Sequence, residues 1–429
     1  MRILFASPAA DGHFNPLTGV ATHLATRGHD VRWYAGPQYA RRVEALGIPV
    51  LPYRRAVEVT GDNINTLFPE RARLKGPRLV SFDLDTFFVG NVEEQFADLV
   101  DLQGDFPFDV FVCDGGMYVE QLVAEELGIP VFATAMSAVV PDAASPPPFF
   151  GLRPARTVVD RARHRVVRAM LRSGMRRGVQ HYNDILAAHG IPPIPADGFP
   201  HVPMASARKI FLDGVPGLEF PGYRPPANAE FVGPLVPTRA ALGADVPLPD
   251  VVTGHTVPVV AVSQGTVDNT DPGKLIEPTL EALAGDGYVV VATTGGSRTE
   301  ELRARFGGPG VVVEDFIPYA SLFPHVDVFV SNGGYGSVVA ALRHGVPVVG
   351  AGTREGKNDV NARLAVNRLG ADLRSEHPGP ARIRRAVERV LADATVLANV
   401  ERLRAELAAH DAVATVTAAV EAVELSPAA

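Results

Sequence analysis

A glycine turn between a short apolar run and a helical pattern could bind a diphosphate. Asn332-Gly333-Gly334 follows the mostly apolar run Val326–Ser331, which predicts a short buried strand, and precedes the helical pattern Ser337–Arg343. Glycine lets a phosphate approach the backbone, and a helix N-terminus offers unpaired N–H groups and a partial positive charge. Asn332, Gly333, Gly334 and Ser337 are therefore candidate phosphate ligands, although a similar turn joins strand and helix in any doubly wound domain.

A histidine and an aspartate follow two other predicted strands. His13 comes after the apolar run Arg2–Ala6, ahead of a helix predicted over Pro16–Thr26, and Asp114 comes directly after Phe108–Cys113. The carboxyl ends of parallel strands share one edge of a sheet, where α/β proteins bind ligands. There His13 could take a proton from a hydroxyl, and Asp114 could orient and stabilise the protonated imidazole. The alternatives are a histidine packed against its helix and an N-cap for a helix that begins near Met117.

Further polar groups are expected at the edge that holds the glycine turn. Thr266 follows the predicted strand Pro258–Val262 and could bind phosphate through its hydroxyl, whereas the backbone of Ile317 could bond the edge of a flat base. After the short run Pro347–Val349 come carboxylates that suit sugar hydroxyls and a lysine that could neutralise phosphate. These residues are Glu355, Lys357 and Asp359. Each could equally belong to an ordinary polar loop.

Composition limits the classes of function. The chain has 429 residues, a net charge of -8 and a single cysteine, Cys113. The negative charge argues against nucleic acid or a phospholipid surface as the main partner. One cysteine excludes a disulfide framework and a cysteine-based metal cluster. The first residues predict a buried strand rather than a signal peptide, and no apolar run approaches the ~20 residues that span a bilayer, so a cytoplasmic protein is expected.

Alternating strand and helix patterns run through the chain and predict an α/β fold built on parallel sheets. A proline-rich stretch interrupts the alternation, which then begins again. We therefore predict an N-terminal Rossmann-like domain over 1–213, an interdomain linker over 214–257 and a C-terminal Rossmann-like domain with a helical tail over 258–429. Two such domains form a cleft between them, the usual place for a ligand.

The order and spacing of these motifs resemble those of the family 1, GT-B type glycosyltransferases, which use sugar nucleotides to modify plant, antibiotic and xenobiotic compounds. The resemblance covers nearly the whole chain. The N-terminal residues that carry it are Gly12-His13-Phe14-Asn15-Pro16 and Asp114. The C-terminal ones are Ser263-Gln264-Gly265-Thr266, Asp315-Phe316-Ile317-Pro318, Asn332-Gly333-Gly334-Tyr335-Gly336-Ser337, Gly345-Val346-Pro347 and Glu355.

The resemblance implies a GT-B fold whose two Rossmann-like domains face each other across the cleft. It implies that His13 is the general base for an acceptor hydroxyl and that Asp114 balances its charge. The acceptor oxygen would attack the anomeric carbon with inversion, through a transition state like an oxocarbenium ion. The donor residues implied are Gly333, Gly334, Ser337 and Thr266 for the diphosphate, the Ile317 backbone for the base and Glu355 for the sugar hydroxyls.

Two positions depart from the family pattern. Asn332 stands where the family usually has histidine, so that Lys357 would supply the missing positive charge. Gly356 stands where glutamine often follows the acidic residue, whereas alignment on Asn361 would place that pair at Lys357-Asn358. The resemblance therefore does not identify the sugar.

We predict an inverting hexosyltransferase that moves a sugar from a UDP- or dTDP-sugar to a hydroxyl of an apolar natural product or drug. The acceptor pocket is expected at Phe82–Phe88, Met136 and Pro146–Phe150. No cofactor beyond the sugar nucleotide and no metal is expected, because the chain has no DxD cluster in the expected place and a helix dipole can stabilise the leaving group. A sugar-nucleotide 2-epimerase and a non-catalytic sugar-nucleotide-binding protein remain alternatives, and the oligomeric state is open.

Overall fold

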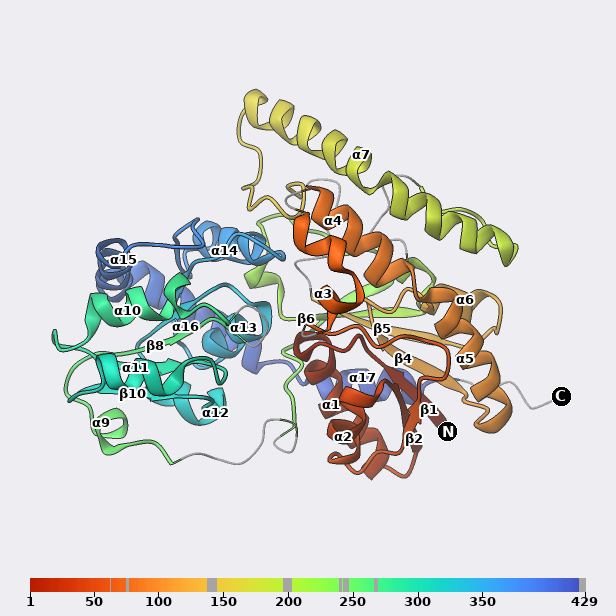
Figure 1. The fold of residues 1–429 in the computed structure, drawn as a ribbon, viewed down its shortest axis with the longest axis horizontal. Helices are drawn as coiled ribbons and strands as arrows, with labels where there is room; N and C mark the ends of the chain where they lie inside the picture. Colours follow the sequence, from red (N-terminus) through yellow and green to blue (C-terminus); the bar gives the residue numbers. More distant parts are fainter. Residues whose placement is uncertain are drawn as a thin grey trace.

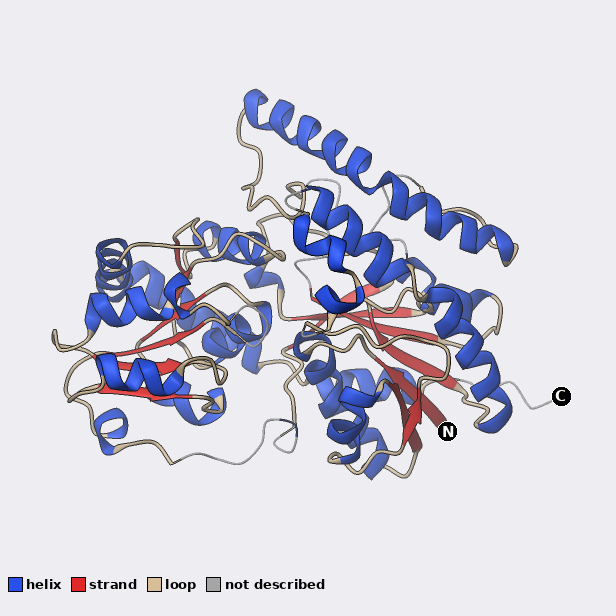
Figure 2. Cartoon of the chain, in the orientation of Figure 1, coloured by secondary structure: helices blue, strands red, loops and turns tan. Residues whose placement is uncertain are grey.

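The computed structural model describes residues 1–429 except 62, 75–76, 137–144, 196–202, 239–240, 242–246, 266–268 and 424–429. Two α/β domains lie side by side (Figure 1), each with a sheet enclosed by helices (Figure 2). Within the described residues, none of the helices combines the length and apolarity that crossing a bilayer requires.

The N-terminal domain is built on a seven-stranded parallel sheet of order β3-β2-β1-β4-β5-β6-β7. Its central strands are buried on both faces, which explains their nearly continuous apolar sequences. The strands are β1 (Arg2–Ala6), β2 (Asp30–Ala35), β3 (Val50–Pro52), β4 (Val110–Asp114), β5 (Val131–Met136), β6 (Lys209–Asp213) and β7 (Ala229–Gly233). The helices are α1 (Asp11–Thr26), α2 (Pro37–Glu44), α3 (Ile64–Leu67), α4 (Pro77–Asp83), α5 (Val92–Asp105), α6 (Glu120–Glu125) and α7 (Val158–Ala188), with a π-helical turn, η2 (Leu84–Val89), after α4.

The C-terminal domain has a six-stranded parallel sheet of order β10-β9-β8-β11-β12-β13. Its strands are β8 (Val259–Ser263), β9 (Val289–Thr293), β10 (Val311–Glu314), β11 (Val328–Ser331), β12 (Val348–Gly350) and β13 (Gly370–Asp372). The helices are α9 (Asp250–Thr253), α10 (Ile276–Leu283), α11 (Thr299–Phe306), α12 (Tyr319–Leu322), α13 (Tyr335–Arg343), α14 (Lys357–Val366), α15 (Pro380–Ala392), α16 (Ala394–Ala408) and α17 (Ala412–Glu421). The two predicted α/β units are thereby confirmed.

Both sheets reverse their strand order between two central strands, which are β1 and β4 in one sheet and β8 and β11 in the other. At such a reversal the connecting helices lie on opposite faces, which leaves a crevice at the carboxyl ends of the strands. His13 follows β1, Asp114 ends β4, and the glycine turn follows β11. The topology therefore places the principal candidate residues at the two crevices.

Two elements link the predicted domains. β7 lies within the segment predicted as a linker and pairs in parallel with β6. At the end of the chain, α17 returns to the first domain, where Ala412, Val416 and Val420 pack into the core beneath α1. The predicted domain boundaries are not tested directly. Because β7 and α17 both pack with the first domain, they favour an N-terminal unit larger than residues 1–213.

Buried polar contacts also join the two domains. The Tyr335 hydroxyl of α13 donates a hydrogen bond to the backbone carbonyl of Asp213, at the end of β6. Nearby, Arg363 of α14 forms a buried ion pair at 2.7 Å with Glu219, in the segment between β6 and β7 whose Leu218 packs in the C-terminal core. The Asp213 carboxyl is buried, and this burial raises its pKa to about 7 despite the hydrogen bond that it accepts from the Leu235 N–H at 3.0 Å.

Asp213→Asn should therefore stabilise the protein increasingly as pH rises. The folded wild type holds a proton on Asp213 up to about pH 7, whereas an unfolded Asp carboxyl loses it near pH 4, so this group weakens folding as pH increases across that window. Asparagine keeps an acceptor oxygen for Leu235 and has no such titration. Urea unfolding at pH 5 and pH 8 should show the advantage of the variant growing by roughly 2–3 kcal/mol.

The matched control is Asp105→Asn, whose side chain is exposed and which should show no such growth. An equal difference between Asp213→Asn and wild type at both pH values would contradict the raised pKa.

Candidate active site

His13 and Asp114 form a hydrogen-bonded pair at the end of β1 and β4. His13 Nδ1 lies 2.7 Å from Asp114 Oδ1, and the same oxygen accepts a hydrogen bond of 2.7 Å from the backbone N–H of Gly116. The His13 side chain retains 29% exposure, so the ring is not sealed in the core. With Nδ1 directed at the carboxylate, Nε2 is the nitrogen left for a substrate.

The helix that carries His13 begins earlier than predicted. The sequence predicted a helix from Pro16, but α1 begins at Asp11, and the N–H groups of His13 and Phe14 both bond the carbonyl of Ala10. Proline removes only its own N–H donor, so the preceding turn can form. His13 is therefore held by the first turn of a helix rather than by a loop.

The local electrostatics raise the pKa of His13. Burial lowers the pKa of the imidazole, but the charge of Asp114 and its hydrogen bond raise it by more, so the pKa lies above its usual value. Asp114 does not cap the next helix as the alternative proposed, because α6 begins only at Glu120. The pair can accept a proton from a hydroxyl and stabilise the resulting imidazolium.

A small cavity of about 30 Å³ lies beside this pair. Its lining includes Pro8 and Gly116, next to the dyad, and the aromatic rings of Phe87 and Phe88. These two phenylalanines belong to the predicted acceptor pocket. Phe82, from the same predicted set, instead packs edge-on against Phe68, with 6.1 Å between ring centroids.

The predicted diphosphate turn lies between β11 and α13. Gly333 has φ of +90°, a conformation that favours glycine, and a Cβ there would lie 2.5 Å from Asn361 Oδ1. Ser337 Oγ donates a hydrogen bond of 2.9 Å to the carbonyl of Gly334 within the first turn of α13. Gly336 is exposed beside it. An anion can therefore reach the unpaired N–H groups at the start of this helix.

Asn332 holds the turn together. Its side-chain amide donates to the backbone carbonyl of Gln264, after β8, and its Oδ1 accepts a hydrogen bond of 3.3 Å from the N–H of Gly334. The residue is 8% exposed. A neutral amide thus links the two strands on either side of the crevice, a role that the sequence did not indicate.

Lys357 and Glu355 lie together after β12. Lys357 Nζ is 2.7 Å from Glu355 Oε2, and the lysine is largely buried while the Glu355 side chain is exposed. The lysine stem lies against Gly352, where a Cβ atom would contact Lys357 Cδ and overlap the carbonyl of Asn332. Glu355 has φ of +55°, an uncommon conformation for a non-glycine residue that is often found at functional sites. These two residues therefore neighbour the glycine turn.

Of the other two residues predicted to bind the sugar nucleotide, the structure describes Ile317 but not Thr266. Ile317 is buried, at the end of the loop after β10. Its neighbour Phe316, part of the same motif, was given no role of its own by the sequence, yet the residue is 46% exposed at the same edge. Thr266 lies outside the described residues, so nothing places it. Among the described residues, no group of three or more His, Cys, Asp or Glu side chains is placed to hold a metal ion.

Asp359 joins the two domains instead of facing a sugar. Its carboxylate accepts hydrogen bonds from the backbone N–H groups of Phe149 and Gly151, the latter at 2.8 Å. Asn358 adds a bond of 2.8 Å from its amide to the carbonyl of Phe149. The predicted acceptor loop is therefore hydrogen-bonded to the first turn of α14, next to Glu355 and Lys357. We call this set of hydrogen bonds from Asp359 and Asn358 to residues 149–151 the clasp. Sequence reasoning missed this role, because the partners are 208 to 210 residues apart.

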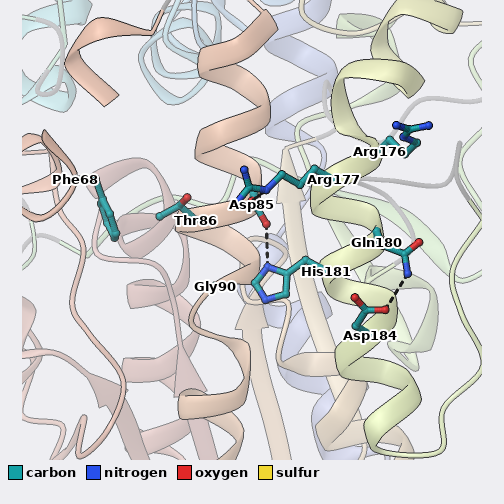
Figure 3. A pocket seen from close by; sticks show the side chains of 9 residues that line it. All are labelled: Phe68, Asp85, Thr86, Gly90, Arg176, Arg177, Gln180, His181 and Asp184. Atoms are coloured by element: carbon teal, nitrogen blue, oxygen red, sulfur yellow. Dashed lines mark hydrogen bonds and ion pairs between the residues drawn. The ribbon is translucent and has the colours of Figure 1, made fainter. Parts of the chain in front are cut away.

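A larger cavity lies away from these residues. It has a volume of about 900 Å³ and lies between η2 and α7 (Figure 3). Asp85 is its most buried charged group and is paired with His181 Nδ1 at 2.8 Å and with Arg177 Nε at 2.8 Å. Because its most buried charge, Asp85, is already paired with His181 and Arg177, this cavity does not itself indicate a reaction.

Comparison with curated proteins shows relatives along the whole chain. Residues 279–423 match the family described as erythromycin biosynthesis protein CIII-like, C-terminal domain. The 4'-demethylrebeccamycin synthase of Lentzea aerocolonigenes is 36% identical over 416 residues, which cover 96% of this chain and 97% of that protein. The demethyllactenocin mycarosyltransferase of Streptomyces fradiae is 28% identical, over 99% of this chain and 86% of that protein.

Solved structures share the fold. The glycosyltransferase of kitacinnamycin superposes with a TM-score of 0.75 at 22% identity, covering 98% of each chain. The spinosyn rhamnosyltransferase SpnG complexed with thymidine diphosphate gives a TM-score of 0.71 at 17% identity, covering 98% of this chain and 100% of that one.

Asp359→Ala should destabilise the protein by about 2 kcal/mol, because it leaves backbone N–H groups of the clasped loop without their charged acceptor. Chemical denaturation followed by fluorescence measures this loss. The control Asp286→Ala breaks an exposed ion pair with Arg384 and should cost less than about 1 kcal/mol. Equal losses in the two variants would show that the clasp contributes no more than a surface ion pair.

Proposed function

Because the chain belongs to the family 1, GT-B natural-product glycosyltransferases, we propose that it transfers a sugar from a UDP- or dTDP-sugar to a hydroxyl of an apolar natural product. The observation that carries the proposal is the His13–Asp114 pair, hydrogen-bonded and still accessible at the crevice of the first sheet. The relatives described above are named as synthases or glycosyltransferases of natural products, which favours transfer over the epimerase alternative.

The proposed reaction is a single displacement. The acceptor hydroxyl gives its proton to His13 Nε2 as its oxygen forms a bond to the anomeric carbon. The bond from that carbon to the diphosphate oxygen breaks, and the nucleoside diphosphate leaves with the electron pair. Attack from the opposite side inverts the anomeric centre. Asp114 stabilises the imidazolium that forms on His13.

The leaving diphosphate would bind at the start of α13. Gly333, Gly334 and Ser337 surround the N-terminal N–H groups, which stabilise developing negative charge without a metal ion. Lys357 would add a positive charge, since Asn332 is neutral and its amide already bonds Gln264. The hydroxyl of Thr266, which lies outside the described residues, is proposed as a further phosphate ligand.

The remaining donor groups would bind the sugar and the base. A bound phosphate competes with Glu355 for Lys357, which would release the Glu355 carboxylate to accept hydrogen bonds from sugar hydroxyls. The backbone of Ile317 would bond the edge of the base, and the exposed ring of Phe316 offers it a stacking surface.

The proposed acceptor is apolar and large, in keeping with the aromatic lining at Phe87 and Phe88 and with the clasped loop at Phe149. The small cavity beside His13 must widen to hold it, which domain or loop motion can provide. We propose a cytoplasmic enzyme that needs only its nucleotide sugar as co-substrate.

Incubation with UDP- and dTDP-sugars and a panel of aromatic, polyketide and macrolide alcohols tests the proposal. Mass spectrometry should show a glycoside, and NMR should show an inverted anomeric centre. Interconverted sugar nucleotide without acceptor would support the epimerase alternative. Donor binding without any turnover across the panel would support the non-catalytic alternative.

His13→Ala should lower kcat by roughly 10²–10⁴-fold, because the acceptor hydroxyl loses its base. Donor affinity, measured by calorimetry with the nucleoside diphosphate, should stay close to that of wild type. The control His23→Ala changes a histidine in the last turn of the same helix and should leave kcat unchanged. Full turnover by His13→Ala would remove this residue from the mechanism.

Asp114→Asn should move the acidic limb of the kcat/KM profile to lower pH. The base acts when neutral, so activity rises as pH passes the pKa of His13, which Asp114 raises. Removing that charge lowers the pKa of His13, while the maximal rate falls because the imidazolium is less stabilised. A pH–rate profile from pH 5 to 9 measures both effects, and an unmoved acidic limb would show that His13 does not control it.

Lys357→Gln should raise the donor KM by roughly tenfold to a hundredfold, because it removes one charged hydrogen-bond donor from the diphosphate. Lys209→Gln, which breaks a surface ion pair between Lys209 of β6 and Glu230 of β7, is the matched control and should leave the donor KM unchanged. Initial-rate kinetics with varied donor distinguish the two. Equal donor KM values in both variants would exclude Lys357 from the donor site.

A further inference from the structure

The first half of α7 exposes an apolar stripe. Val158, Val159, Val166 and Met170 are 71%, 75%, 60% and 54% exposed, a degree of exposure that is unusual for large apolar residues on one short segment. Val158, Val166 and Met170 fall on one face because side chains four residues apart neighbour each other on a helix. The stripe runs along the outer side of the helix, opposite the face whose buried residues pack on the domain.

The helix lies at the periphery of the molecule. It packs over α4 and η2, and its first half extends along the outside of the N-terminal domain (Figure 1). Of residues 158–174, only His164 is buried, whereas the buried contacts concentrate from Met175 onward. The stripe is therefore free to meet an external surface along ~18 Å of helix, at ~1.5 Å per residue.

Arginines flank the stripe on both long sides. At about 100° per residue, Arg163 lies on one side of the stripe and Arg161, Arg165 and Arg172 on the other. These arginines and Arg176 are exposed and form no ion pair with the residues that the structure describes. Residues 158–177 contain seven arginines and one acidic residue, Asp160, in a chain whose net charge is -8. The overall charge thus conceals a basic face, which the composition did not predict.

The charge pattern distinguishes between possible occupants. A second copy of α7 would bring arginines against arginines, so self-pairing through this face is opposed by like charge. Asp160 cannot compensate, since it is engaged in the capping box at Thr157. The occupant must therefore be anionic at the edges and apolar at the centre.

A bilayer surface with anionic headgroups has this arrangement. Apolar side chains in the centre of the stripe can enter the boundary of the acyl chains, while arginines at the edges extend to the phosphates. The stripe is carried by a helix that packs on α4 and η2 through its opposite face, so it can lie along a flat surface. Figure 3 shows Arg176 and Arg177 on the following turns of α7, beside the larger cavity, where Arg177 pairs with Asp85.

We propose that residues 158–172 of α7 dock the protein reversibly on anionic phospholipid membranes, with the helix parallel to the bilayer surface. The site is separate from the His13–Asp114 pair and does not depend on the transfer reaction. Each arginine near an anionic surface contributes modestly, so binding should be peripheral and sensitive to salt.

Flotation of the full-length protein with lipid vesicles tests the proposal. The probes are vesicles of phosphatidylcholine alone and of equal parts phosphatidylcholine and phosphatidylglycerol. At low salt, the partition coefficient should be at least roughly tenfold higher for the anionic vesicles, and it should fall when the ionic strength is raised to about 0.5 M, which shortens the Debye length.

Two variants separate the apolar and the charged contributions. Val159→Ser/Val166→Ser/Met170→Ser and Arg161→Gln/Arg165→Gln/Arg172→Gln should each lower the partition coefficient at least roughly tenfold. The matched controls are Leu397→Ser, an exposed apolar residue on α16, and Arg382→Gln/Arg385→Gln/Arg389→Gln, which makes the same change of charge on α15. Both controls should bind vesicles like wild type. All five proteins should show the same far-UV spectrum and melting temperature.

Absence of flotation on anionic vesicles would overturn the proposal, as would equal binding by the α7 variants and their controls. Binding of polyglutamate without binding of vesicles would assign the face to an acidic protein instead. A dimer of the wild type that dissociates in the Val159→Ser/Val166→Ser/Met170→Ser variant would assign it to self-association. Both of these results contradict membrane docking.

Discussion

The hydrogen bond between His13 and Asp114 is the interaction on which the chemistry proposed for this protein depends. It exists because β1 and β4 are neighbours at the point where the order of the first sheet reverses, so residues 101 positions apart meet at one edge. The pair keeps the imidazole oriented and raises its pKa. Without this contact, the first domain would offer a histidine with no fixed direction and no stabilisation of its charge.

The second domain repeats the same topology with different chemistry. Its reversal point lies between β8 and β11, where the chain presents backbone N–H groups rather than an acid or a base. Tyr335 and Asp359 each reach from this domain to the first through a hydrogen bond. The two proposed sites, a proton acceptor in the first domain and an anion site in the second, are thereby held in one molecule by polar contacts between the domains.

The sequence predicted the elements that depend on local pattern. The two α/β units, the strand before the glycine turn and the proximity of His13 to Asp114 are confirmed, because period, glycine placement and sheet topology determine them. The start of α1 was predicted too late, since Pro16 was given more weight as a boundary than one missing donor warrants. The roles of the site residues remain predictions.

The interdomain contacts could not be predicted in the same way. Nothing near Asp359 indicates that its carboxylate would accept N–H groups from a loop in the other domain, and nothing near Asn332 indicates that its amide would bond Gln264. The first contact depends on how the two domains pack and the second on how two neighbouring strands of the C-terminal sheet end, and burial of a polar residue gives no signal in its neighbours. The exposed stripe of α7 could not be predicted either. Its apolar residues have helical spacing, but only the fold shows which face of the helix is left uncovered.

A crystal structure with a nucleoside diphosphate and an acceptor bound would test the central claim most directly. We expect the diphosphate at the N-terminus of α13 and the acceptor hydroxyl within about 3 Å of His13 Nε2, with the ring still bonded to Asp114. A diphosphate bound elsewhere, or an acceptor hydroxyl with no approach to the imidazole, would contradict the proposed transfer.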